Sequence, residues 1–141
     1  MKSDSEMKGD LTMGILDLFF NDSSTSGAAR HPDSYYEDDG RPCRDKILQV
    51  LAEEFPRYTV YEDISPRDLG GEGNFMNYSI AVCEGNVIRL VIMIIGKTTT
   101  SHREYRWSRE FAESHQIIFL NFIRHYPNSV QYISDRLHQY L

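Results

Sequence analysis

The chain has 141 residues and a formal net charge of −6, and 40% of its residues are hydrophobic. This length fits one domain, and the composition is sufficient for a packed core. The longest apolar run, residues 90–95, is far shorter than the about 20 residues that span a bilayer. The chain also opens without a secretory signal pattern. Two cysteines fit neither a disulfide framework nor a zinc pattern, so we expect a cytoplasmic protein without a transmembrane segment.

The acidic charge is concentrated at the start of the chain. Residues 1–41 hold nine acidic and four basic residues, whereas the remainder is nearly neutral. Residues 21–40 carry almost no aliphatic side chains, so they cannot bury enough apolar area to offset the entropy lost on ordering. We therefore expect residues 1–41 to be a mostly disordered acidic tail and residues 42–141 to be a folded domain. Such a domain lacks the overall basic bias of a duplex-binding protein, although a local basic patch stays open.

A short apolar segment interrupts this tail at residues 13–20. It is interpreted as a chain end that packs on the domain or frays, as a docking peptide for a partner's groove, or as a shallow membrane-surface anchor. The anchor is the weakest of the three, because anionic lipid would repel the acidic flanks. The side chains that would make a partner or membrane contact are Ile15, Leu16, Leu18, Phe19 and Phe20.

The folded region begins with a predicted helix over residues 42–55. Pro42 suits the first turn of a helix, and Pro56 ends it. Apolar residues recur at helical spacing in between. Residues 57–64 are rich in tyrosine, threonine and valine and predict a strand. Residues 65–77 contain a proline and three glycines and predict a loop.

Two further strands are predicted at residues 78–83 and 87–95, joined by a hairpin-sized break that contains a glycine. The second is apolar on both faces, which is typical of a strand in the middle of a covered sheet.

Residues 101–115 predict a helix with Trp107 and Phe111 on one face, and residues 116–122 predict another apolar strand. A helix between two buried strands is typical of parallel pairing, so residues 90–95 and 117–122 should be parallel neighbours.

A last helix is predicted after Pro127, with Asn128 or Ser129 as its N-cap. The complete order is then helix, three strands, helix, strand and helix. This pattern predicts an α/β domain with a mixed central sheet. The apolar stripe of the last helix is Val130, Ile133, Leu137 and Leu141.

Two stretches of this region resemble a nuclease family. Residues 78–82 (YSIAV) and 89–96 (RLVIMIIG) are similar to two central strands of the very-short-patch-repair-endonuclease-like branch of the PD-(D/E)XK restriction-endonuclease-like fold, which read roughly xDFxL and LxIExDG. The helix and apolar strand downstream fit the same branch. The resemblance covers about residues 42–141 and implies an α-β-β-β-α-β core, often with a closing helix.

The chain also resembles a set of uncharacterised bacterial proteins. These have an opening like GLFDxFF, an acidic linker and an ending like FxxHxPNxxxYVxxRI. The last part is carried here by Phe122, His125, Pro127, Asn128, Tyr132, Ile133, Arg136 and Leu137.

The positions implied to be catalytic hold residues that cannot bind a metal. The metal-binding aspartate of the resembled family falls near Ser79, its glutamate at Met93, and the following acid or lysine at Ile95. Phosphodiester hydrolysis by this fold needs carboxylates on a divalent cation, which prefers oxygen ligands. We therefore expect no catalytic residue and no cofactor here. The leading hypothesis is a catalytically inactive nuclease-fold domain that acts as a binding or interaction module, its partner unknown and possibly a nucleic acid or a protein.

Two other functions remain open. One is a metal-dependent nuclease with relocated acids, for which Glu62, Asp63 and Glu84 are available. The other is a domain that binds a small ligand or nucleotide. No two of the five histidines have the i, i+4 spacing of a helical metal pair, so we expect no metal site.

The densest group of basic and hydroxyl side chains starts at the end of the second predicted hairpin strand. An anion could bind there, since a helix N-terminus attracts negative charge. The alternative is ordinary helix-surface charge paired with Glu104, Glu110 and Glu113. The candidate ligand or nucleic-acid contacts are Lys97, His102, Arg103 and Arg106.

Overall fold

In a computed structural model of the protein, residues 33–141 are described. The expectations for residues 1–32, including the apolar segment at 13–20, lie outside the described residues. Among residues 33–141, none of the helices combines the length and apolar character needed to span a membrane.

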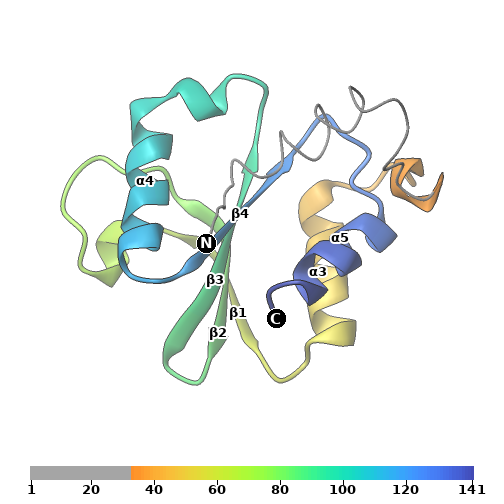
Figure 1. The fold of residues 1–141 in the computed structure, drawn as a ribbon, viewed down its shortest axis with the longest axis horizontal. Coiled ribbons are helices and arrows are strands. Elements are labelled where there is room, and N and C mark those ends of the chain that lie inside the picture. Colours follow the sequence, from red (N-terminus) through yellow and green to blue (C-terminus); the bar gives the residue numbers. More distant parts are fainter. Residues whose placement is uncertain (1–32) are drawn as a thin grey trace. The chain divides into compact units, whose positions relative to one another are not determined.

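A four-stranded mixed sheet forms the centre of the domain (Figure 1). Its strands are β1 (Thr59–Ile64), β2 (Tyr78–Glu84), β3 (Val87–Ile95) and β4 (Ile118–Ile123), in the order β1-β2-β3-β4. The first two pairings are antiparallel, and β3 and β4 are parallel. The predicted α/β class, the order of elements and the mixed sheet are confirmed.

The parallel pair was predicted from the apolar runs on either side of one helix. Leu90 lies opposite Ile118 and Ile95 lies opposite Ile123, so the predicted neighbours are confirmed. β3 lies between two strands, and its second half is almost fully buried. β4 is equally apolar, but it is an edge strand whose first residues are only half-buried.

The outer edge of β4 is closed by polar side chains in place of a fifth strand. Arg136 Nη1 donates a hydrogen bond to the Asn121 carbonyl, and Asn128 Nδ2 donates one to the Ile123 carbonyl at 2.7 Å. Arg136 is buried and lies over the Phe122 ring, with its guanidinium carbon 4.9 Å from the ring centroid. Edge carbonyls without a partner would cost free energy, so these contacts stabilise the end of the sheet.

Three helices cover the sheet. α3 (Cys43–Glu54) and α5 (Val130–His138) pack against each other on one side, and α4 (Arg103–Ser114) lies on the other (Figure 1). α5 begins at the N-cap Ser129, whose hydroxyl accepts a hydrogen bond from the Tyr132 amide at 3.1 Å. This confirms one of the two predicted caps. Asn128 instead has a left-handed φ of 46°.

The buried face of α4 consists of a tyrosine and two small residues. Tyr105, Ser108 and Ala112 face the core, whereas Trp107 is 36% exposed. A buried serine is tolerated because its hydroxyl donates to the Met76 carbonyl at 2.6 Å and accepts from the Met76 amide at 2.8 Å. Trp107 and Phe111, predicted to share one face, are exposed and half-buried, and the smaller side chains on the core side let the helix approach the sheet.

The compact unit of the structure extends over Ser34–Leu141, so it includes residues 34–41, which the sequence places in the tail. The 3₁₀ helix Asp33–Tyr36 brings the Tyr35 ring against Tyr132 of α5, with ring centroids 5.3 Å apart. The Tyr35 hydroxyl also donates a hydrogen bond to Asp135. These residues lead directly to α3 and form part of the site described next.

Candidate functional site

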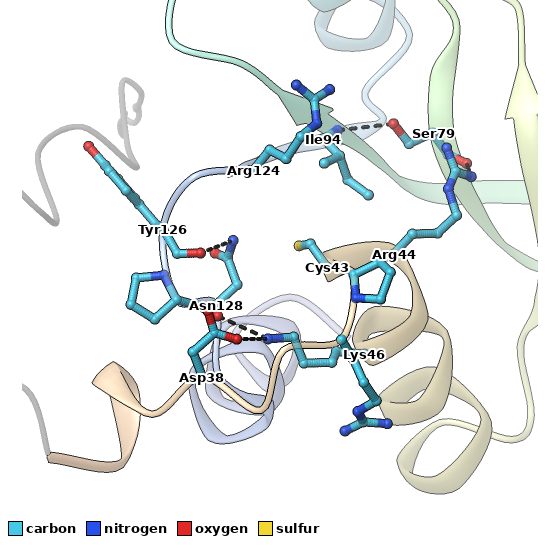
Figure 2. A pocket seen from close by; sticks show the side chains of 12 residues that line it. Asp38, Cys43, Arg44, Lys46, Ser79, Ile94, Arg124, Tyr126 and Asn128 are labelled. Atoms are coloured by element: carbon cyan, nitrogen blue, oxygen red, sulfur yellow. Dashed lines mark hydrogen bonds and ion pairs between the residues drawn. The ribbon is translucent and has the colours of Figure 1, made fainter.

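A pocket of about 320 Å³ lies where α3 begins, β2 starts, β3 ends and the chain leaves β4 (Figure 2). Four of its twelve lining residues are basic and one is acidic. The residues that line it are Asp38, Arg41, Pro42, Cys43, Arg44, Lys46, Ser79, Ile94, Arg124, Tyr126, Pro127 and Asn128.

The two central strands contribute Ser79 and Ile94. The backbone pairing of β2 with β3 begins at Ile80, which lies opposite Ile92. Beyond that pair the Ser79 hydroxyl accepts a hydrogen bond from the Ile94 amide at 3.0 Å, as Figure 2 shows. A side chain therefore continues the ladder at the place where the strands begin to separate. Such a separation next to a covered sheet leaves room for a pocket.

Arg44 of α3 is held firmly beside Ser79. Its Nη1 donates to the Ser79 carbonyl at 2.9 Å and to Glu62 Oε1 at 3.1 Å. Its Nη2 donates to Asp63 Oδ1 at 3.2 Å. Two carboxylates at the end of β1 therefore offset the charge of this guanidinium and orient it.

Lys46 lies one turn into α3 and is only 2% exposed. Its Nζ donates to the Pro127 carbonyl at 2.9 Å and lies 3.7 Å from Asp38 Oδ1 and 3.9 Å from Asp39 Oδ1. A buried ammonium is stable only where polar groups replace its water. Here the loop after β4 supplies one hydrogen bond, and the segment before α3 supplies two carboxylates at longer range.

Arg124 follows β4, and its amide donates to the Ile95 carbonyl at 2.8 Å. Its guanidinium makes no hydrogen bond or ion pair within the part of the chain that the structure describes. Its Nη1 lies 3.2 Å from the position that a Cβ at Gly96 would occupy. The absence of a side chain at Gly96 therefore lets Arg124 lie close to the end of β3.

The first turn of α3 adds backbone donors to the pocket. The N-cap Pro42 provides no side-chain cap. Within residues 33–141 the amides of Cys43, Arg44 and Asp45 have no hydrogen-bond partner. These amides are the positive end of the helix dipole, so they favour negative charge.

The Cys43 side chain also lines the pocket and is buried. Burial raises the pKa of its thiol to about 11, although the nearby charges of Lys46 and Arg124 lower it. A neutral thiol is a poor nucleophile and a poor metal ligand. Cys43 therefore contributes an apolar wall to the pocket at neutral pH.

The positions implied by the nuclease resemblance divide between two faces. Ser79 lines the pocket, whereas Met93 and Ile95 do not line it and are each 1% exposed. Asn121 lies opposite Met93 in the parallel pair, and its Nδ2 donates to the Tyr105 hydroxyl of α4 at 2.6 Å. Met93 therefore faces the α4 layer, and Ile94, which precedes Ile95, faces the pocket.

The predicted contact residues Lys97, His102, Arg103 and Arg106 are all exposed, and none of them lines the pocket. The Arg103 guanidinium carbon lies 5.5 Å from the centroid of the Trp107 ring. No ion pair joins Arg103 or Arg106 to the acidic residues of α4 in the described part of the chain. These residues form a basic surface with one aromatic side chain, separate from the pocket.

The acids considered for a relocated metal centre do not converge. Glu62 and Asp63 bind Arg44 at one end of the sheet. Glu84 pairs with Arg89 at 3.6 Å at the hairpin end, about 13 Å further along β2. Over residues 33–141, no three His, Cys, Asp or Glu side chains lie close enough to hold a metal ion.

Comparison of the chain with protein-family models, with curated proteins and with solved structures finds no match. The pocket is therefore interpreted from its own residues. Its basic members come from two separate stretches of the chain, residues 41–46 and Arg124, so no local motif reveals the whole set. One feature of the sequence could have indicated the pocket. Arg44 and Lys46 lie in the first turns of a predicted helix, where the helix dipole disfavours cations, so their presence there suggests a role other than helix stability.

Proposed function

We propose that this chain is a non-catalytic binding domain, a member of the restriction-endonuclease-like fold in which the site of metal chemistry has become a basic ligand pocket. The observation that carries the proposal is the lining of the pocket beside the separated ends of β2 and β3. The strands contribute Ser79 and Ile94 to it, and the surrounding elements contribute four basic side chains.

Two features support the link to that fold. The order α-β-β-β-α-β-α and the mixed sheet are those that the resemblance implies. The pocket also adjoins the two strands on which the resembled family holds its acids, and Ser79 is one of the corresponding positions.

The charge of the pocket argues against metal-assisted hydrolysis. A divalent cation needs several carboxylate or carbonyl oxygens. Glu62 and Asp63 already bind the guanidinium of Arg44, and the side chains of Lys46 and Arg124 would repel a metal ion. The same charges attract anionic groups.

A cleavage assay tests the proposal. The purified full chain is incubated with plasmid DNA, single-stranded DNA and single-stranded RNA, with magnesium or manganese. We expect no cleavage. Metal-dependent cleavage that is lost in a Glu62→Gln, Asp63→Asn variant would contradict the proposal and establish the relocated nuclease centre.

The exposed face of α4 favours a second candidate function, contact with single-stranded nucleic acid. Cations next to an exposed aromatic ring are typical of surfaces on which bases stack. Trp107 is the only tryptophan of the chain, so stacking on it would quench the intrinsic fluorescence.

The second candidate is tested by titrating oligonucleotides at several salt concentrations. Quenching that saturates, weakens with salt and is lost in an Arg103→Ala, Arg106→Ala variant would support it. Unchanged fluorescence at low salt would contradict it.

A further inference from the structure

We propose that the pocket binds the phosphate group of a small molecule, and that the Asp38–Asp39 segment competes with this group for Lys46. The inference rests on the proposed function, because it names the ligand class of the non-catalytic pocket.

The first support is a carboxylate that already lies in the pocket. Asp38 lines the pocket, and its Oδ1 lies 3.7 Å from the buried Lys46 Nζ. Asp39 Oδ1 lies at 3.9 Å. Both distances exceed that of a hydrogen bond, so these carboxylates offset the ammonium charge without satisfying its donors.

The second support is the number of donors left for an anion. An ammonium has three N–H donors, and the Pro127 carbonyl accepts one of them at 2.9 Å. Arg124 has no hydrogen-bond or ion-pair partner within residues 33–141, and neither do the amides of Cys43 and Arg44. A phosphate group has three strong acceptor oxygens pointing in different directions, so it can accept from a lysine, an arginine and a helix N-terminus together.

The third support is the looseness of the competing segment. The side chains of Asp38 and Asp39 are 57% and 46% exposed. Each carboxylate also accepts a hydrogen bond from a backbone amide within its own segment, Asp38 from Gly40 at 2.9 Å and Asp39 from Arg41 at 3.0 Å. The local turn, and not a hydrogen bond to Lys46, therefore holds both carboxylates near the ammonium.

The size of the pocket selects a small ligand. A volume of about 320 Å³ lies at the lower end of the range for small-molecule sites. It accommodates a phosphate with a modest organic group. The hydrophobic part of such a ligand would lie against Ile94 and the neutral thiol of Cys43.

The test is a calorimetric titration of the full chain in buffer free of phosphate and sulfate. Inorganic phosphate is the first probe, and a nucleoside monophosphate is the second. We expect saturable binding of both, weakened about tenfold or more in Arg124→Gln, which corresponds to the loss of one charge-assisted hydrogen bond. Arg89→Gln removes the same charge at the hairpin end of β3, away from the pocket, and we expect it to leave the affinity unchanged.

A second variant tests the competing segment. Asp38→Asn with Asp39→Asn keeps the oxygens that accept from the Gly40 and Arg41 amides and removes both negative charges. It also frees the Arg41 guanidinium, which donates to Asp39 Oδ2 at 2.9 Å, so a second cation becomes available to the ligand. We expect it to bind phosphate at least about threefold more tightly than the unmodified chain, since less than 1 kcal/mol of competition is enough for that change.

Three outcomes would overturn the inference. Absence of saturable phosphate binding in both the unmodified chain and the double aspartate variant would exclude the phosphate site. Equal weakening by Arg124→Gln and Arg89→Gln would show a general charge effect. Binding of single-stranded DNA that is lost in Arg124→Gln and that inorganic phosphate does not displace would assign the pocket to a polymer. None of these outcomes bears on the cleavage assay, so the non-catalytic proposal stands or falls separately.

Discussion

Introducing carboxylates at the positions of the resembled metal centre should destabilise the protein without restoring cleavage. The decisive residue is Met93, which is 1% exposed and faces the α4 layer beside Asn121. In Met93→Glu the new side chain is similar in length to the one it replaces, so the effect comes from its polarity. A carboxylate at this buried position would lose its hydration, which disfavours its charged form.

The expected magnitude depends on pH. Protonated, the introduced acid can donate to Asn121 Oδ1, which is buried without a hydrogen-bond partner in the described part of the chain, so we expect a loss of only about 1–3 kcal/mol. Ionised, the introduced acid has no such partner, so its folded-state pKa is raised above the unfolded value of about 4.3. The free energy of unfolding then falls by about 1.4 kcal/mol per pH unit as the pH rises from the unfolded-state pKa to the folded-state pKa. With a folded pKa near 7, a further loss of about 3–4 kcal/mol accumulates by neutral pH.

The assay is urea unfolding of the unmodified chain, Met93→Glu and Met93→Gln at pH 4.5 and pH 7. The glutamine variant has nearly the same shape without the charge, and its loss should be the same at both pH values. A Met93→Glu deficit that does not grow with pH would refute the placement of Met93 in the core. Magnesium-dependent cleavage by Ser79→Asp with Met93→Glu would refute the inactive interpretation as well.

Three further predictions follow from the described contacts. Gly71→Ala should lower the free energy of unfolding, measured in urea, by about 1–3 kcal/mol, because the new Cβ would lie 2.9 Å from Cε2 of Phe111. A loss below about 0.5 kcal/mol would show that the phenylalanine ring moves aside freely. Asn128→Gly should lower the free energy of unfolding by about 1–3 kcal/mol, because it removes two hydrogen bonds to backbone carbonyls. Asn128→Ala should lower it by about 1 kcal/mol more, because alanine is strained at a φ of 46°. Equal losses in the two variants would contradict this strain. Burial raises the pKa of the Cys43 thiol to about 11 and also raises the pKa of Cys83. Both thiols should therefore react slowly with a thiol reagent at pH 8 in the folded protein and quickly in denaturant. Rapid labelling of the folded protein would contradict their burial.

The candidate site was only partly predictable from the sequence. The basic group after β3 was predicted because its members lie close together in the chain. All four are exposed, Lys97 and His102 before α4 and Arg103 and Arg106 on it. The pocket was missed because Arg124 is far from Arg44 and Lys46 in the sequence and meets them only through the fold. The resemblance also aligned the second and third metal-centre positions of the nuclease family with Met93 and Ile95. Both of these side chains are buried outside the pocket, and Ile94 between them is the β3 residue that lines it.

The sequence by itself determined the order of the elements and the parallel pair. Continuous apolar runs such as residues 90–95, in a segment bounded by glycines, favour buried strands, and a connecting helix favours a parallel pairing of two such strands. These are local properties, because each depends on the spacing of neighbouring side chains.

Only the tertiary structure decided which faces and edges are covered. β3 and β4 are similarly apolar, yet one is central and the other is an edge closed by Arg136. Trp107 is larger than Ser108, yet the serine is buried because Met76 satisfies its hydroxyl. Lys46 is buried because a loop carbonyl and two distant carboxylates surround it. In each case burial depends on partners supplied by another segment, and no pattern within one segment encodes them.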